Sequence, residues 1–222
     1  MILNGHEFEY YEDEHLYVVD GIIVPSITQL LAMKFGGKYA GVSKEVLAKA
    51  AAAGTRVHQA IEMYAKTGEK ADLPEMRGFE FLKRAYGFEV VDSEVPVIVS
   101  YQNIPIAAGR LDLVLKMNGE LGGADIKRTA VLDKEYLAYQ LNLYRIGYQQ
   151  TYGKDWTFLR GIHLRNDTRK FVNIPINEQM IYEFLEEYID EQSEPDWQND
   201  QQYRSEEYTV GQSGCEFYPC SR

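Results

Sequence analysis

The clearest alternation of apolar and polar residues in the chain runs from Gly109 to Lys127 and is centred on Asn118-Gly119. Asn-Gly favours a two-residue type I′ turn, because both turn residues need a positive φ, and this turn fixes the register of the flanking strands. The opposed pairs in this register are Met117 with Glu120, Leu115 with Gly122, Leu113 with Ala124, Asp112 with Asp125, Leu111 with Ile126 and Arg110 with Lys127. The pattern predicts a β-hairpin with one apolar face, which includes Ile126, and one charged face.

The charged face of this hairpin carries Arg110, Asp112, Asp125 and Lys127. Directly opposed residues have Cβ atoms about 4.5–5.5 Å apart, so two facing aspartates are destabilising unless something offsets their repulsion. Either one carboxylate is protonated, with a raised pKa, or a divalent cation lies between them. Two acids and a lysine suit a metal-activated water that attacks a phosphodiester, with the lysine orienting or activating the water or stabilising developing charge. The alternative is a solvated salt-bridge cluster on an exposed face.

The periodicity elsewhere predicts an α/β protein with one main domain over residues 1–190. Strand-type runs around Asp20-Gly21 predict an antiparallel β-meander over residues 1–26. Residues 27–87 read as helical: a short helix after a Ser26 N-cap, a helix from Lys44, a second segment after Gly54-Thr55, and a helix from Pro74 to Tyr86. Residues 88–190 read as a core of strands and helices: a long strand or two short ones broken at Pro96, the hairpin, a helix over 134–152, two strands joined at Asn166-Asp167, and a helix capped by Asn177.

Charge is distributed unevenly along the chain, whose net charge is −11. Residues 1–26 contain six acids and no Lys or Arg, and the segment around the last helix is also strongly acidic. By contrast, residues 27–60 carry five Lys and Arg against one Glu. A polyanion can therefore approach the middle of the chain in spite of its acidic ends. Residues 191–222 are polar and acidic with little periodicity, which predicts an irregular tail.

Cysteine content and hydropathy restrict the class of protein further. Cys215 and Cys220 are the only cysteines, so one chain offers neither a disulfide framework nor a four-cysteine iron–sulfur site. Both are expected to be reduced. No apolar run approaches the roughly 18 residues of a membrane span, and the N-terminus does not resemble a signal peptide. We therefore expect a cytoplasmic protein without a membrane partner, either bacterial or, if phage-encoded, in the host.

Two predicted helices carry polar side chains beside their apolar stripes. His58 and Glu62 are four residues apart and share one helix face. Taken alone, His58 reads as a packed, hydrogen-bonded histidine and Glu62 as a solvated helix residue. Gln140 and Tyr144 are also four apart, and a glutamine within such a stripe is less readily explained by packing. Glu94 lies in the strand before the hairpin, either near the charged face or in solvent.

Four segments together resemble the RecB-like branch of the PD-(D/E)XK nuclease superfamily. They are Gly54-Thr-Arg-Val-His58-Gln-Ala-Ile-Glu62, Gly109-Arg-Leu-Asp112, Asp125-Ile-Lys127 and Gln140-Leu-Asn-Leu-Tyr144. The resemblance covers roughly Val24 to Tyr152. Within this branch the chain is most similar to mitochondrial genome maintenance exonucleases and phage-encoded relatives, and the similarity includes the Pro-Ser-Ile-Thr-Gln-Leu-Leu segment that leads into the first helix. The third motif often has Glu where this chain has Asp125. The cysteines of the iron–sulfur branch are missing, as is a helicase domain.

The resemblance implies a restriction-endonuclease-like core, which is a mixed β-sheet flanked by helices. It also implies Mg²⁺ or Mn²⁺ held by Asp112, Asp125 and the Ile126 carbonyl. In this family Lys127 serves the attacking water, His58 binds metal or positions substrate, and Gln140 and Tyr144 support the site. Glu94 and Glu62 become candidates for an additional acid. Candidates for phosphate contacts are Lys38, Lys44, Lys49, Arg56, Arg110 and Arg128.

The activity implied by the resemblance is a metal-dependent DNA exonuclease that acts on single-stranded or frayed ends in recombination, repair or replication. It hydrolyses phosphodiesters with inversion, and a single-strand-binding or recombination protein would be a suitable partner. Two alternatives stay open: a duplex-end resecting exonuclease of the phage recombination type, and a catalytically silent DNA-binding protein that keeps the fold.

Overall fold

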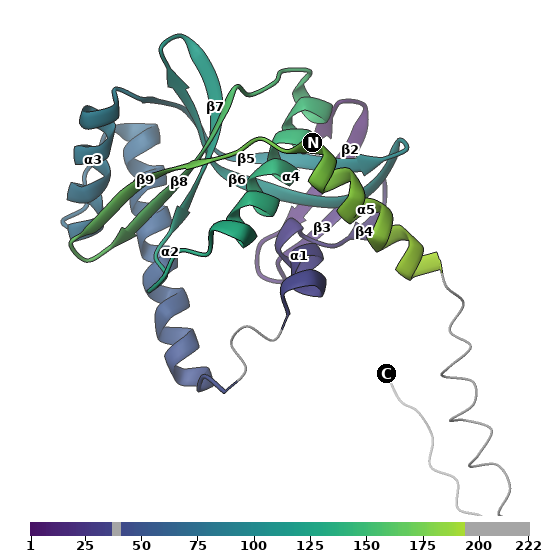
Figure 1. Ribbon diagram of the computed structural model, residues 1–222, viewed down its shortest axis with the longest axis horizontal. Helices are drawn as coiled ribbons and strands as arrows, with labels where there is room; N and C mark the ends of the chain where they lie inside the picture. The colour runs from purple at the N-terminus through teal and green to yellow at the C-terminus, as the bar shows by residue number, and fades with distance from the viewer. Residues whose placement is uncertain (37–40, 194–222) are drawn as a thin grey trace, which may run out of the picture. The chain divides into compact units, whose positions relative to one another are not determined.

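A computed structural model of the protein describes residues 1–36 and 41–193 (Figure 1). Met1–Tyr182 form one compact unit, and a second unit begins at Glu183. The strands are β1 (Ile2–Leu3), β2 (His6–Tyr11), β3 (Leu16–Val19), β4 (Ile22–Val24), β5 (Glu89–Tyr101), β6 (Ile104–Met117), β7 (Glu120–Lys127), β8 (Phe158–Arg165) and β9 (Thr168–Ile174). The helices are α1 (Ile27–Phe35), α2 (Lys44–Thr67), α3 (Pro74–Tyr86), α4 (Lys134–Tyr152) and α5 (Glu178–Ser193).

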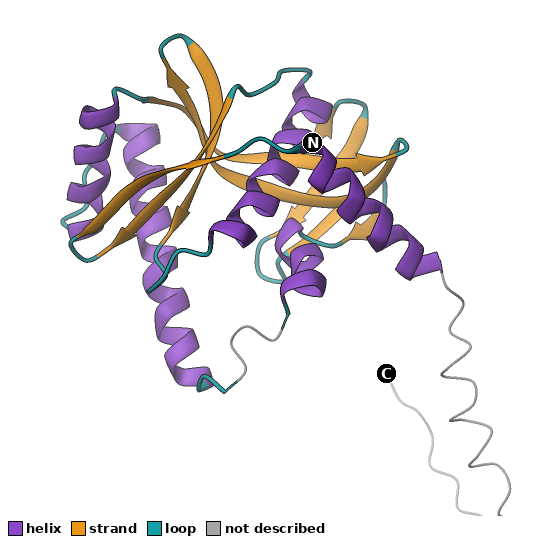
Figure 2. Cartoon of the chain, in the orientation of Figure 1, coloured by secondary structure: helices purple, strands orange, loops and turns teal. Residues whose placement is uncertain are grey.

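The strands of the first unit form two sheets (Figure 2). The N-terminal sheet has the antiparallel order β1-β2-β3-β4, which confirms the predicted meander. The larger sheet has the order β5-β6-β7-β8-β9, in which β7 and β8 are parallel and the other neighbours antiparallel. Helix α4 makes the crossover between the two parallel strands, as parallel pairing requires. The chain is therefore an α/β protein with a mixed sheet flanked by helices, as predicted.

Helices cover both faces of the larger sheet. On one face, Val57 of α2 and Phe79 of α3 pack in one apolar cluster with side chains of three neighbouring strands. These are Leu113 of β6, Ala124 of β7 and Ile162 of β8. Glycines mark the opposite face, where α4 approaches the strands: a Cβ on Gly161 would lie 2.5 Å from the Leu137 side chain. The absence of a side chain at such positions lets the helix pack closely on the sheet.

The hairpin between β6 and β7 follows the predicted register from its turn as far as Leu113 opposite Ala124. The turn residues Asn118 and Gly119 have φ of 52° and 87°, as a type I′ turn requires. The ladder ends there, so the predicted pairing of Asp112 with Asp125, and of the two pairs beyond it, is wrong. The Ile126 N–H instead donates to Asp112 Oδ2 at 2.6 Å. The strands separate because a side chain, not a main-chain carbonyl, accepts this bond.

Helix α2 is continuous from Lys44 to Thr67, so the two predicted segments are one helix. Gly54 does not interrupt it because its alanine-rich neighbours favour helix enough to offset the cost of about 1 kcal/mol of one glycine. Similarly, Pro96 does not break β5, since it remains paired with Arg110. The irregularities of β5 fall instead at Val90–Asp92 and Val99–Ser100.

The N-terminal sheet has its own apolar cluster, in which Phe8, Tyr17 and Val19 pack against Ile98 and Ala108 of the larger sheet. Two further interactions join the sheets. The Ala108 N–H donates to the Pro25 carbonyl at 3.0 Å, and Ser26 forms a parallel bridge with Ala108. Ser26 also caps α1 as predicted, with a capping box to Gln29. The meander is thereby fixed against the strand that leads into the hairpin.

The predicted tail over residues 191–222, with Cys215 and Cys220, lies outside the described residues except for 191–193, which end α5. The compact first unit ends at Tyr182, somewhat before the predicted limit at residue 190. Among the described residues, no helix combines the length and the apolar character that crossing a membrane requires.

Candidate metal centre

Asp112 lies on β6 at the point where β6 and β7 separate. Its Oδ2 accepts the Ile126 N–H, and its Oδ1 lies 3.4 Å from His58 Nδ1. Burial opposes ionisation of Asp112, but the His58 ring and Lys127 together hold the pKa of this carboxyl below its ordinary value. Asp112 is therefore an anion at neutral pH, with one oxygen fixed by the main chain and the other directed at the imidazole.

Asp125 and Lys127 lie two residues apart on β7 and face the same side, as predicted. The Lys127 ammonium donates to Asp125 Oδ1 at 2.9 Å and lies 2.7 Å from Oδ2 without hydrogen-bond geometry. Asp125 is almost fully buried, and this burial, with the Asp112 charge, raises its pKa to about 6. Burial alone would lower the pKa of Lys127, but Asp125 and Asp112 raise it above its ordinary value.

His58, Glu94 and Asp112 bring one nitrogen and two carboxylate oxygens within 4.8 Å of one another. His58 comes from α2, Glu94 from β5 and Asp112 from β6. Burial works to lower the pKa of His58, but Asp112 raises it to about 9, so the metal-free ring is protonated at neutral pH. Burial raises the pKa of Glu94 to about 7, with a further contribution from Asp112.

These three side chains fit a divalent cation. Carboxylate oxygens and a histidine nitrogen are ligands that Mn²⁺ accepts, and carboxylates suit Mg²⁺ as well. The structure thus places Glu94, which the sequence indicates only as a possible extra acid, beside Asp112 and His58. Asp125 is the predicted ligand that stands apart from this group, because its carboxylate faces Lys127. The Ile126 carbonyl stays a prediction, while the Ile126 side chain is buried in the core as expected.

Gln140 and Tyr144 lie on α4, and both are buried. Gln140 Oε1 has no hydrogen-bond partner among the described residues. Tyr144 packs on the main chain of β6, where a Cβ added to Gly109 would lie 3.1 Å from its ring. Burial raises the pKa of Tyr144 well above its ordinary value, so the hydroxyl stays protonated. Gln140 therefore has a buried acceptor without a partner among the described residues, and Tyr144 supports the strand that carries Asp112.

His58, Glu94 and Asp112, which we call the candidate metal group, line a pocket of about 660 Å³. Its wall includes Tyr10 and His15 of the N-terminal sheet, the α2 face with Gly54, His58 and Glu62, and Tyr144. Glu62 is held by Lys66 at 2.5 Å and is not part of the metal group. Within the described part of the chain, Arg110 is the only Lys or Arg that lines this pocket.

The other predicted phosphate contacts lie in different places. Lys44, Lys49 and Arg56 are exposed on α2, and Lys49 pairs with Glu45 at 3.0 Å. Successive residues of an α-helix are about 100° apart around its axis. Lys44 therefore lies on nearly the same side of α2 as His58, whereas Lys49 and Arg56 lie on the opposite side. Arg128 donates to buried Glu75 at 2.8 Å, so it holds the end of β7. Lys38 lies outside the described residues.

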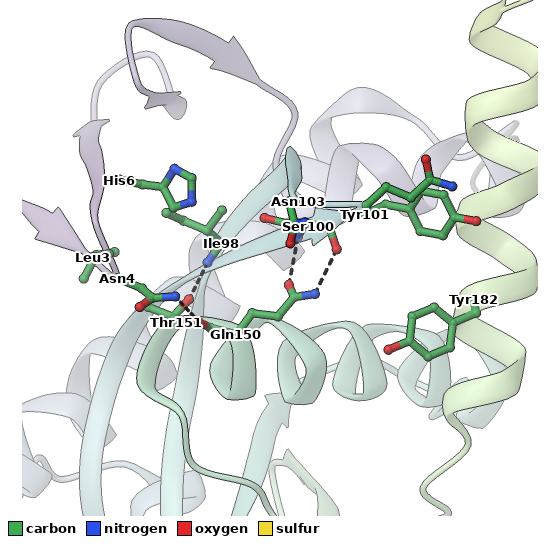
Figure 3. A pocket seen from close by; sticks show the side chains of 11 residues that line it. Leu3, Asn4, His6, Ile98, Ser100, Tyr101, Asn103, Gln150, Thr151 and Tyr182 are labelled. Atoms are coloured by element: carbon green, nitrogen blue, oxygen red, sulfur yellow. Dashed lines mark hydrogen bonds between the residues drawn. The ribbon is translucent and has the colours of Figure 1, made fainter.

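A second pocket, of about 450 Å³, lies beside the N-terminal sheet and the end of α4 (Figure 3). The Gln150 side chain exchanges two hydrogen bonds with the Ser100 main chain, at 2.8 and 2.9 Å. Asn4 donates to the Gln150 carbonyl at 2.8 Å, and the Ile98 N–H donates to Thr151. Among the described residues that line it there is no Asp, Glu, Lys or Arg, so it offers a metal ion no carboxylate and a phosphate no Lys or Arg.

No protein-family model matches the chain, and no curated protein matches it. Among solved structures, the chain is similar to the crystal structure of SSO0001, with a TM-score of 0.44 and 18% sequence identity over 81% of this chain and 82% of that one. Similarity at this level says nothing about activity, so function has to be inferred from the residues of the site.

Proposed function

We propose that the protein is a metal-dependent deoxyribonuclease of the RecB-like PD-(D/E)XK branch, with a restriction-endonuclease-like core, and that it acts as an exonuclease on single-stranded or frayed DNA ends. One observation carries the proposal. Where β6 and β7 separate, the Lys127 ammonium contacts buried Asp125, while His58, Glu94 and Asp112 converge within 4.8 Å beside it. Mg²⁺ or Mn²⁺ is the implied cofactor.

His58, Glu94 and Asp112 would hold the metal ion, and Asp125 would approach it if the Asp125–Lys127 contact loosened. A bound Mg²⁺ or Mn²⁺ would supply Lewis acidity that activates water and neutralises phosphate charge. Asp112 needs no reorganisation for this role, since the Ile126 N–H already fixes one of its oxygens. Such preorganisation is how electrostatic catalysis avoids an energetic cost during the reaction.

Lys127 supports hydrolysis as a cation in this proposal. Its pKa lies above the ordinary value of lysine because of Asp125 and Asp112, so the ammonium is protonated at neutral pH. A protonated lysine cannot take a proton from water. It can orient the attacking water and stabilise negative charge that develops on the phosphate oxygens. Among the roles open for this lysine, orientation and charge stabilisation are therefore favoured over general base catalysis.

Cleavage assays on the wild-type protein and two site variants test the proposal. Labelled linear single-stranded, linear duplex and circular DNA are incubated with Mn²⁺, with and without EDTA. We expect loss from the ends of linear single strands only with metal, and a decrease of about 100-fold or more in Asp125→Asn and Lys127→Met. Asp72→Asn and Lys70→Met, which change exposed side chains that form ion pairs elsewhere on the chain, are matched controls.

Melting curves and DNA binding in Ca²⁺ show whether each variant is folded. Undiminished cleavage by Asp125→Asn or Lys127→Met would refute the site. Cleavage of duplex ends in preference to single strands would instead assign the protein to the resecting type. DNA binding without cleavage by the wild-type protein would leave the silent DNA-binding alternative.

A further inference from the structure

Arg110 is held over the pocket by partners on two sides. Its Cζ lies 4.3 Å from the centre of the Tyr10 ring, and its Nε lies 3.4 Å from Glu94 Oε2. Tyr10 is itself fixed, since its ring packs on Tyr17 at 4.7 Å and its hydroxyl is hydrogen-bonded to His15 at 3.0 Å. The guanidinium is thus oriented by the N-terminal sheet as well as by the acid.

Glu94 has two competing sets of partners. On one side is Arg110, at a distance longer than the range of about 2.7–3.2 Å for an N–H···O hydrogen bond. On the other side are His58 and Asp112, with which Glu94 forms the candidate metal group. A divalent ion in that group would carry twice the charge of the guanidinium and sit closer to the carboxylate. Glu94 would therefore turn toward the metal ion and release Arg110.

The charges around the pocket decide what Arg110 would then bind. Four carboxylates line the pocket, namely Glu12, Glu62, Glu94 and Asp112. Arg110 is the only Lys or Arg among the described lining residues. A phosphodiester entering this acidic pocket needs cations, and the candidate metal group and Arg110 are what the wall offers. The guanidinium is planar and has five N–H donors, so it can bind two phosphate oxygens at once.

We propose that Arg110 is the substrate-phosphate ligand of this site, oriented by Tyr10 and released by Glu94 when Glu94 binds the metal ion. This inference rests on the proposed nuclease function and deepens it. Tyr10 keeps the guanidinium over the pocket after Glu94 has turned away, because stacking on an aromatic face does not need the carboxylate. The N-terminal sheet therefore takes part in binding the substrate.

Binding measurements on Arg110→Gln and Arg110→Lys test this proposal. The matched control is Arg169→Gln, since Arg169 also lies 4.3 Å over an aromatic ring, that of Phe81, but does not line the pocket. The Kd of a short labelled oligothymidylate is measured in Ca²⁺ over a series of salt concentrations. The Kd of Mn²⁺ is measured by calorimetry without oligonucleotide.

We expect Arg110→Gln to weaken oligonucleotide binding by about 10- to 100-fold and to reduce the salt slope by about one, as the loss of one phosphate contact does. Arg110→Lys keeps the slope and weakens binding less. The affinity for Mn²⁺ should be unchanged or higher in Arg110→Gln, because a competitor for Glu94 is gone. Arg169→Gln should match the wild type in all three measurements.

Two results would overturn the role of Arg110. Oligonucleotide binding by Arg110→Gln within about twofold of wild type would show that no phosphate contact is lost. A parallel loss of Mn²⁺ affinity would assign Arg110 to positioning Glu94. Failure of the nuclease proposal is a separate outcome: the wild-type protein would not cleave DNA, whatever Arg110→Gln does to oligonucleotide binding. If binding still depended on Arg110, the phosphate-binding role would stand without catalysis.

Discussion

Glu94 adopts φ of 54°, a left-handed conformation that residues with a side chain rarely hold. Its neighbours Ser93 and Val95 pair with Leu113 and Leu111, so Glu94 lies in the strand opposite Asp112. A non-glycine residue in this conformation costs about 1–2 kcal/mol. The pairing on both sides keeps Glu94 in place in spite of this cost. The backbone of β5 therefore aims an acid at the metal group.

Glu94→Gln tests whether this acid is a metal ligand. The substitution keeps the shape but removes a charge, so we expect the affinity for Mn²⁺ to fall about tenfold or more. Without metal, the same variant should melt at a higher temperature than the wild type at pH 8. At this pH the wild-type Glu94 carries a charge that its burial disfavours, and glutamine carries none. Calorimetric titration and melting curves in EDTA provide the two readouts.

Glu89→Gln, an exposed position on the same strand, is the control for Glu94→Gln and should behave as wild type. Unchanged Mn²⁺ affinity in Glu94→Gln would remove Glu94 from the metal group.

Asp112, Asp125 and Lys127 could be selected from the hairpin pattern alone, whereas His58 became a candidate only through the resemblance of its segment to a known family. Glu94 could not be assigned with the same clarity. Its position relative to Asp112 depends on its left-handed φ and on the displacement of the β5 register between Val90 and Asp92. A strand pattern of period two does not reveal either feature. Chemistry that depends on such irregularities has to be read from the structure.

Helix α2 extends well before the part that contacts the core, since only Val57 and Ile61 of its residues are buried. Gly54 sits at the beginning of the packed part, with nothing within 4 Å of an added Cβ. Gly54→Ala should therefore stabilise the protein by about 0.5–1 kcal/mol, because alanine loses less backbone entropy in a helix. Denaturant unfolding measures the change.

Gly68→Ala is the matched control for Gly54→Ala, because Gly68 ends the same helix at φ of 77°. It should destabilise, since alanine is strained in that conformation. A loss of stability in Gly54→Ala would mean that the helix is not continuous there.

Strand β7 requires glycine at its centre. A Cβ on Gly123 would lie 2.3 Å from the buried Trp156 ring. Gly123→Ala should therefore cost about 1–3 kcal/mol of unfolding free energy, because the ring has no space to move. The melting temperature reports the loss, and adding Trp156→Leu should recover part of it. An unchanged melting temperature in Gly123→Ala would contradict the packing of the ring on β7.

The hairpin illustrates how far local sequence patterns determine pairing. Asn118-Gly119 determines the pairs near the turn, and these agree with the structure as far as Leu113 and Ala124. Beyond them the Asp112 side chain takes the Ile126 N–H, and the ladder ends. The conformation of the Asn118-Gly119 turn does not determine the pairing of residues this far along the two strands. The prediction of two opposed aspartates was wrong in geometry, although both acids do lie at the same site.

Stability of the metal-free protein should depend on pH through the raised pKa values of His58 and Glu94. Their folded pKa values are about 9 and about 7, above the ordinary 6.5 and 4.5. The folded state therefore binds more protons, and its free energy of unfolding falls as pH rises toward 9. The pKa of Asp112 is lowered in the folded state, so Asp112 stabilises the fold at any pH above the ordinary pKa of an aspartate. Its contribution therefore does not change between pH 6 and 9.

We expect the melting temperature in EDTA to decrease between pH 6 and 9, with a loss of about 1–3 kcal/mol. Added Mn²⁺ should reverse the trend, because metal ligands must lose their protons and the ion then binds more tightly at high pH. Scanning fluorimetry at several pH values with and without Mn²⁺ measures both curves. His58→Asn should flatten the EDTA curve. Parallel curves with and without metal would contradict the proposed ligands.

The joined N-terminal sheet determines when the pocket can exist during synthesis. Residues 1–25 leave the ribosome before β5 and β6, yet Phe8 and Tyr17 are covered only after Ile98 and Ala108 have been made. Contacts so distant in sequence form late in folding, and the apolar side of the early strands stays exposed until then. Since Tyr10 and Arg110 come from these two parts, the pocket that both residues line cannot form on a nascent chain before β6 has emerged.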